Sequence, residues 1–219
     1  MDKRLLSMRT KGFTLVELLV VMVIIAVLAA LVMGGFSKSK ETTNAMKCAA
    51  NLKQIGVAMA SYCADHDGRL PGPLLEEQHN TPAALAGAKS LGGMLKDYLG
   101  IQTVGAKTNT GTFTCPSWEQ YDRSGSTAVF VVNVSARLTE LNNQLPWGDN
   151  STPPARLAAL SDWQADLTDG PISSTRVWAL RDATREGASK KEPSPHGDFY
   201  NALFFDFHVA KLNLNQKPK

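Results

Sequence analysis

The stretch KGFTLVELLVVMVIIAVLAALVMGGF, residues 11–36, is the part of the sequence around which the rest of the chain is organised. From Leu15 to Phe36 it contains one charged residue, Glu17, and no proline. An apolar run of about 20 residues is long enough to cross a bilayer as a helix, which satisfies its own backbone groups in lipid. We therefore expect residues 13–36 to form a membrane-spanning helix.

The charge of the chain is concentrated in front of this run. The 219 residues carry a net charge of +3, and the first twelve hold four basic side chains and one acidic one. Positive charge upstream predicts an N-terminus that stays in the cytoplasm and a C-terminal domain that is exported. The remainder of the chain is neutral, which argues against a nucleic-acid-binding surface.

A cleaved secretory signal is the competing interpretation, because small residues occur within the apolar run. Glu17 argues against it. A carboxylate inside an apolar segment is expensive unless it finds a partner.

The apolar pattern continues beyond the run with helical spacing. Positions in steps of three and four form one stripe, made of Ala45, Ala49, Leu52, Ile55 or Gly56, Met59, and Tyr62 or Cys63. We expect one helix from about residue 14 to 64, whose amphipathic part, residues 37–66, receives a globular domain formed by residues 67–219. Gly68 and Pro71 are expected to end this helix.

The globular domain is predicted to be α+β. Thr81 and Pro82 are typical of a helix start, and we expect a second helix over 82–99. Strands are expected at 112–115, 128–134, 156–161, 175–180, 202–205 and 209–214. One long helix followed by strands favours a small antiparallel sheet packed on that helix.

Three cysteines are present, Cys48, Cys63 and Cys115. On one helix, Cys48 and Cys63 would lie roughly 22 Å apart, which excludes a bridge between them. A disulfide, if one forms, must use Cys115, with Cys48 as a possible partner. Three buried thiols are equally compatible with the sequence.

The order Lys-Gly-Phe-Thr-Leu-Val-Glu-Leu-Leu-Val-Val at 11–21 resembles the prepilin signal shared by type IV pilins and type II secretion pseudopilins. The resemblance implies that residues 1–12 are a leader, which a prepilin peptidase removes by cutting between Gly12 and Phe13. It also implies a methylated Phe13 amine, and an assembly role for Glu17, which would pair with the Phe13 amine of a neighbouring subunit. A carboxylate in a low-dielectric helix bundle needs such a cation.

Further residues resemble a bacterial pilin-like group. The Cys48-Ala-Ala-Asn-Leu-Lys-Gln-Ile-Gly56 segment, Gly68-Arg-Leu-Pro71 and the middle Cys115-Pro116 carry the first part of the likeness. The group ends in His, nine residues, then Asp-Gly; here His196 is followed by nine residues and Asp206, with Phe207 in place of Gly. Glycine suits a tight hairpin because it reaches positive φ without penalty. We therefore expect either another turn type or a Phe207 held by packing.

The same region raises the question of a metal site at His196, Asp198, Asp206 and His208. These residues lack the close spacing typical of zinc ligands. We instead expect Asp206 to cap a turn and His196 to bond to backbone across the sheet, with His208 beside them as part of a structural site. No hydrolase or nucleotide-binding motif occurs, so neither an enzyme nor a cofactor is expected.

Together these features predict a pilin-like subunit of the bacterial inner membrane. It would cross the membrane once, with its C-terminal domain periplasmic or extracellular, and assemble into a type II secretion pseudopilus or a type IV pilus-like filament. The partners implied are prepilin peptidase, other pilin subunits and inner-membrane lipid. The alternative is a membrane-tethered module that binds polysaccharide or a secreted substrate through tryptophans such as Trp147 or the loop 142–154.

Overall fold

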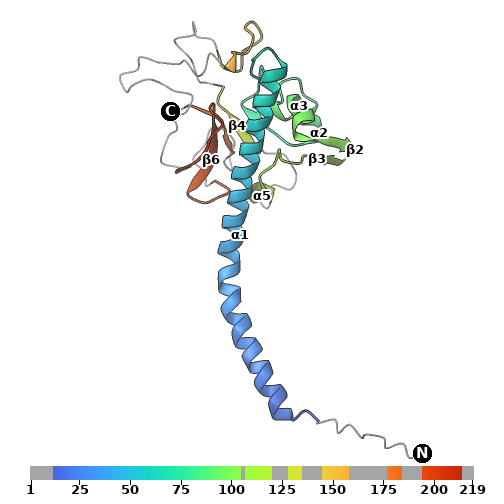
Figure 1. Ribbon diagram of the computed structural model, residues 1–219, viewed down its shortest axis with the longest axis vertical. Helices are drawn as coiled ribbons and strands as arrows, with labels where there is room; N and C mark the ends of the chain where they lie inside the picture. Colours follow the sequence, from blue (N-terminus) through green and yellow to red (C-terminus); the bar gives the residue numbers. More distant parts are fainter. Residues whose placement is uncertain are drawn as a thin grey trace, which may run out of the picture. The chain divides into compact units, whose positions relative to one another are not determined.

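The structure is a computed structural model that describes residues 12–104, 107–119, 128–134, 145–157, 177–183 and 194–213. The chain divides into two compact units, Met1–Lys40 and Glu41–Lys219 (Figure 1). Each unit is described by itself. The helix α1 contributes to both.

Helix α1 runs over Leu15–Asp65, 51 residues, close to the expected range of 14–64. The sequence contains no proline in this range, and its good helix formers favour a continuous helix. In the first unit, the large apolar side chains from Phe13 to Leu31 are exposed. Within the described part of the chain, no helical stretch is both long enough and apolar enough to cross a membrane.

The helix ends at the turn that the sequence indicates. The amide of Gly68 donates to the carbonyl of Cys63 at 2.8 Å, and Gly68 has a φ of +74°. Asp67 also adopts a positive φ, +56°, and its carboxylate pairs with Arg156. Residues in this left-handed conformation reverse the chain and satisfy carbonyls of the last helical turn.

The second unit is built on a five-stranded antiparallel sheet with the order β1-β4-β5-β6-β7. The strands are β1 (Glu77–Gln78), β4 (Phe130–Val132), β5 (Trp178–Asp182), β6 (Phe199–Phe204) and β7 (Val209–Asn213). Strands β6 and β7 form a hairpin in which Phe199 lies opposite Asn213 and Leu203 opposite Val209. The α+β class with an antiparallel sheet is therefore confirmed.

The stripe on α1 packs where the sequence places it. Cys48, Leu52, Ile55 and Met59 are each 0% exposed and belong to one core cluster with residues of the sheet. Burial of a large apolar side chain contributes about 1.5–3 kcal/mol, so this stripe fixes the sheet to the C-terminal part of α1. In Figure 1, α1 passes between the sheet and the segment that carries α2 and α3.

The predicted helix over 82–99 is wrong as a single element. The structure has three short helices, α2 (Pro82–Leu85), α3 (Leu91–Met94) and α4 (Lys96–Leu99). Thr81 caps the first as expected, and Ser90 caps the second. The break between α2 and α3 has a local basis, because Gly87 is a poor helix former and the Ser90 side chain caps the start of α3.

The predicted strand at 112–115 is also wrong. The amide of Phe113 bonds to the carbonyl of Thr110 in a turn, and helix α5 (Pro116–Glu119) follows directly. A two-stranded ribbon of β2 (Gln102–Val104) and β3 (Lys107–Asn109) precedes this turn and was not anticipated.

The structure agrees in part with the remaining expected strands. Arg156 forms an isolated bridge with Arg69, and the rest of 156–161 lies mostly outside the described residues. The other four expected segments, 128–134, 175–180, 202–205 and 209–214, overlap β4, β5, β6 and β7 respectively. Strand β1 was missed because two residues give no periodic pattern.

Candidate functional site

The start of α1 carries a reciprocal hydrogen-bonded cap. Glu17 Oε2 accepts from the backbone N–H of Thr14 at 2.9 Å and from the Thr14 hydroxyl at 2.8 Å. In return, the Thr14 hydroxyl oxygen accepts from the backbone N–H of Glu17 at 3.3 Å. This is a capping box, in which a Thr at the N-cap and a Glu three residues later satisfy each other's backbone donors.

The backbone on either side of the expected cleavage point is open. Gly12 and Phe13 are exposed, and a Cβ placed on Gly12 would meet nothing within 4 Å. Residues 1–11 of the expected leader lie outside the described residues. The backbone at Gly12 and Phe13 is therefore accessible just before the cap of α1.

The geometry orients the Glu17 carboxylate and leaves it acceptor capacity. Its Oε2 atom is held by Thr14, which fixes the direction of the carboxylate relative to the first turn. A carboxylate has two oxygens and about four acceptor positions, so the group retains capacity for a cation.

A second polar site lies inside the second unit, around His196 of the C-terminal signature. Its Nε2 atom lies 2.9 Å from Oδ2 of Asp182, and both side chains are 0% exposed. Asn201 donates to the same oxygen through its backbone N–H at 3.0 Å and through Nδ2 at 2.8 Å. Asn201 Nδ2 also lies 3.4 Å from the carbonyl oxygen of Ala45 on α1.

This buried network differs from the expectation for His196, which was a bond to backbone across the sheet. The imidazole bonds to a side chain instead, because the last residue of β5 presents a buried carboxylate. Asp182 and Asn201 were missed. The signal available in the sequence was a polar residue within each apolar strand, since such residues are buried only with partners.

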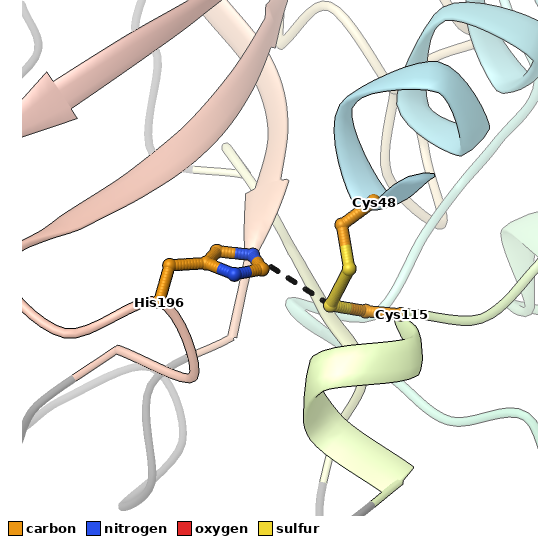
Figure 2. Close-up of side chains that lie close together, drawn as sticks. All are labelled: Cys48, Cys115 and His196. Atoms are coloured by element: carbon orange, nitrogen blue, oxygen red, sulfur yellow. Dashed lines mark hydrogen bonds between the residues drawn. A yellow bond between two sulfur atoms is a disulfide. The ribbon is translucent and has the colours of Figure 1, made fainter. Parts of the chain in front are cut away.

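Beside the network, Cys48 of α1 and Cys115 ahead of α5 form a disulfide, while Cys63 is a buried free thiol. Cys115 Sγ lies 3.7 Å from His196 Nε2 (Figure 2). The sequence was compatible with this disulfide and with three unpaired thiols, and the structure has the disulfide. It ties α1 to the segment that begins α5.

The hairpin between β6 and β7 contains the other signature residues. Phe207 N donates to Phe204 O and Phe204 N to His208 O, both at 2.9 Å, which defines a three-residue loop. Phe207 has a φ of +64°, in the position that usually takes glycine. Asp206 Oδ1 accepts from the backbone N–H of His208 at 3.1 Å and lies 2.6 Å from His208 Nδ1.

Packing explains how phenylalanine is tolerated there. A Cβ at Gly56 of α1 would lie 3.3 Å from Cβ of Phe207 and 3.0 Å from Cδ1 of Leu203, so the hairpin rests directly on the glycine. The Phe207 side chain packs against the core, and its carbonyl accepts from Lys53 Nζ at 2.8 Å. Tertiary contact therefore offsets the strain of a left-handed non-glycine residue, roughly 1–2 kcal/mol.

The four residues considered as metal ligands do not gather at one place. His196 is in the buried network, Asp206 and His208 pair on the hairpin, and Asp198 is exposed. Within the described residues, the group of His, Cys, Asp or Glu side chains close enough to hold a metal ion is Cys48, Cys115 and His196.

The tryptophan considered for ligand binding is part of the core. Trp147 is 1% exposed, and its Nε1 donates to the carbonyl of Asn133 at 2.9 Å. A side chain at this depth does not contact a ligand on the surface. Residues 142–144 and Trp163 lie outside the described residues.

Comparison with known proteins identifies the N-terminal segment. Residues 7–33 match the family model for the prokaryotic N-terminal methylation motif. The prepilin-type signal expected from the order of residues 11–21 is therefore confirmed.

Two curated relatives align with part of the chain. The chain is 33% identical over 64 residues to the ComG operon protein 3 homolog of Bacillus licheniformis, and 33% identical over 64 residues to the competence protein ComGC of Bacillus subtilis. Each alignment covers 29% of this chain, and 66% and 65% of the respective relative's own length. No solved structure matches the chain.

Proposed function

We propose that this chain is a pilin-like subunit that a prepilin peptidase trims and that assembles through α1 into a type II secretion pseudopilus or a type IV pilus-like filament. The observation that carries the proposal is the ordered motif at the start of α1, which lies within the methylation-motif match over residues 7–33. The accessible backbone at Gly12 and Phe13 supports cleavage between them.

The apolar surface of the first unit supports both anchoring and assembly. Large side chains from Phe13 to Leu31 are 45–80% exposed in the isolated chain. Monomeric soluble proteins rarely expose contiguous apolar surface on this scale, so it needs lipid or other apolar helices around it. We assign residues 13–36 to the inner membrane before assembly, with the N-terminus cytoplasmic, and to the packed helical core of a filament afterwards.

In this proposal Glu17 determines how neighbouring subunits pair. In a bundle of apolar helices an unpaired carboxylate is strongly destabilising, and the amine that cleavage creates at Phe13 is a suitable cation. Thr14 holds one carboxylate oxygen from within the same chain. The other oxygen then faces the amine of a neighbouring subunit.

Mass spectrometry of the mature N-terminus tests the first step. The chain is co-expressed with a prepilin peptidase, and the expected product begins at a methylated Phe13. A product that retains residues 1–12, or that begins elsewhere, contradicts the proposal. A parallel culture without the peptidase supplies the unprocessed control.

Filament assembly tests the role of Glu17. Glu17→Gln keeps the size of the side chain and removes its charge, so we expect membrane insertion to persist while filaments, counted by electron microscopy, are lost. Glu17→Asp retains the charge and is the matched control, with partial assembly expected. Normal filament yield from Glu17→Gln would refute the proposed pairing.

A further inference from the structure

The residues just before α5 lie along α1 and are hydrogen-bonded to it beside the disulfide. Asn51 Nδ2 donates to the carbonyl oxygen of Thr114 at 2.8 Å, and Thr114 directly precedes Cys115. Side chains three residues apart lie on one face of a helix, so Cys48 and Asn51 both face this segment. The hydrogen bond therefore holds Cys115 opposite its partner Cys48.

A second side-chain contact sets the direction of the segment. The hydroxyl of Thr112 donates to Oε1 of Gln54 at 2.9 Å. As the position on α1 advances from 48 to 51 to 54, the contacted position moves back from 115 to 114 to 112, so the segment runs antiparallel to the helix. These three contacts involve no strand of the five-stranded sheet. The segment can therefore dock on α1 before the sheet packs there.

The lengths of the possible loops oppose the bridge that the structure contains. Of the three possible pairs, Cys48 and Cys63 are closest in sequence, and Cys48 and Cys115, separated by 67 residues, are farthest apart. Loop closure costs more as the loop lengthens. An unfolded chain therefore favours Cys48–Cys63 about ninefold, and Cys63–Cys115 about 1.5-fold, over Cys48–Cys115.

Formation of α1 removes one of the two wrong bridges. On the helix, Cys48 and Cys63 lie roughly 22 Å apart, which is beyond the reach of a disulfide. Both can still meet Cys115. A contact that distinguishes the two positions on α1 is then required, and Asn51 makes such a contact one turn from Cys48.

We propose that Asn51 is the positioning residue that directs Cys115 to Cys48 rather than to Cys63, and that this bridge forms before the sheet packs on α1. Thiol–disulfide exchange with an external disulfide supplies the bond. The inference concerns the folding of the second unit and goes beyond the proposed role in a filament. It holds whether or not the chain assembles.

The exchange balances in two steps. The thiolate of one cysteine attacks the external disulfide, so a mixed disulfide forms and one external thiolate leaves. The thiolate of the other cysteine then attacks the mixed disulfide and releases the second external thiolate. Cys48 and Cys115 together lose two electrons and two protons. The external disulfide gains them and becomes two thiols.

Burial of the finished bond supports this order of events. Cys48 and Cys115 are both 0% exposed. The ring of His196 lies against Cys115, with Nε2 3.7 Å from Sγ, and Asn201 of β6 lies with Nδ2 3.4 Å from the carbonyl oxygen of Ala45, one turn before Cys48 (Figure 2). Exchange requires a third sulfur to reach the pair. Once β6 and the loop before it cover the pair, an external disulfide has no access.

The third cysteine does not disturb the bridge after folding. Cys63 is a free thiol and is 2% exposed. Burial raises the pKa of this thiol to about 11, so at neutral pH it stays protonated and is a poor nucleophile. The choice between Cys48 and Cys63 is therefore made while the domain is still open.

The identity of the first bridge tests the proposal. The full-length chain is reduced in urea, diluted into detergent buffer that contains glutathione disulfide, and alkylated at early times before disulfide mapping by mass spectrometry. The parent chain should form mainly Cys48–Cys115. In Asn51→Ala, the ratio of Cys48–Cys115 to Cys63–Cys115 should fall about fivefold, the change expected from one net hydrogen bond. An unchanged ratio in Asn51→Ala overturns the proposal.

Two control variants separate positioning from general stability. Leu203→Ala removes buried atoms of β6, so it should weaken the folded domain and leave the first bridge unchanged. Ser61→Ala removes a hydrogen bond that lies within α1 and should also leave the bridge unchanged. If Leu203→Ala shifts the ratio as much as Asn51→Ala, pairing follows the packing of the sheet and the proposal fails.

A second measurement needs only the folded parent chain. Dithiothreitol is added to the oxidised protein in native buffer and in denaturing urea, and the loss of the disulfide is followed by alkylation. We expect reduction to be at least about a thousandfold slower in native buffer, because the opened form of a small domain is populated at about that level or below. Similar rates in the two solutions would show that the packed domain admits exchange, which overturns the proposed order.

Discussion

The two halves of α1 both carry large apolar side chains, but these side chains have opposite surroundings within their own units. In the first half, side chains such as Ile24 and Leu28 are more than half exposed. In the second half, Leu52 and Ile55 are 0% exposed beneath the sheet and its loops. One helix therefore carries two kinds of apolar surface, one covered by its own chain and one that is not.

The difference shows where each half gains its stability. The second half is held by intramolecular contacts, namely the core stripe, the Cys48–Cys115 disulfide and the hairpin resting on Gly56. The first half has a capping box at its start and an exposed apolar surface beyond it. We expect substitutions in the second half to change folding, and substitutions in the first half to change association.

The largest effect should follow from removing the disulfide. Cys48 and Cys115 are 67 residues apart in sequence, and a loop of that length corresponds to about 4 kcal/mol in the chain-entropy account. The double variant Cys48→Ala/Cys115→Ala should lower the free energy of unfolding of the second unit by about this amount. Urea titration followed by tryptophan fluorescence measures it, since all four tryptophans lie beyond residue 41. An unchanged midpoint would show that the core stripe alone holds this half of α1.

Paired truncations compare the two halves directly. Ile55→Ala removes buried core atoms and should cost about 2–5 kcal/mol in the same titration. Ile24→Ala makes the same chemical change on the exposed half and should leave the unfolding of the second unit unaltered. Equal destabilisation by both would contradict the division of α1 that we describe.

The hairpin gives a smaller and more local effect. Phe207→Ala loses packing against the core and keeps a strained positive φ, whereas Phe207→Gly loses the packing and relieves the strain. Phe207→Gly should therefore be more stable than Phe207→Ala by about 1 kcal/mol in urea titration. If the alanine variant is the more stable of the two, the loop does not keep its left-handed residue.

The smallest effect is expected at the helix start. Thr14→Ala removes the hydroxyl that caps α1 and should weaken the first turn by about 1 kcal/mol without changing the unfolding of the second unit. Faster amide hydrogen exchange at Glu17 would report the change, and Thr14→Ser should restore most of the protection. Exchange at the parent rate in Thr14→Ala would show that Glu17 does not depend on the cap.

Local signals in the sequence were sufficient for the long elements. The 51-residue helix, its stop near Gly68 and the apolar stripe from Ala45 to Cys63 follow from periodicity and from the absence of proline. The α+β class and the prepilin-type signal follow from the order of residues along the chain. The sequence did not predict short elements such as β1 and the separate helices α2, α3 and α4. Two to four residues show no periodic pattern, and their conformation is set by residues that pack around them in the fold.

The sequence by itself determined the features that depend on neighbours along the chain: the long helix, its apolar stripe and the methylation motif, within which Glu17 lies three residues after Thr14. Tertiary structure alone decided which distant residues meet. It pairs Cys48 with Cys115, brings His196 to Asp182 and Asn201, and lets Phe207 keep a left-handed conformation against Gly56. The physical reason is that these contacts join residues far apart in sequence, so their geometry exists once the sheet has packed on α1.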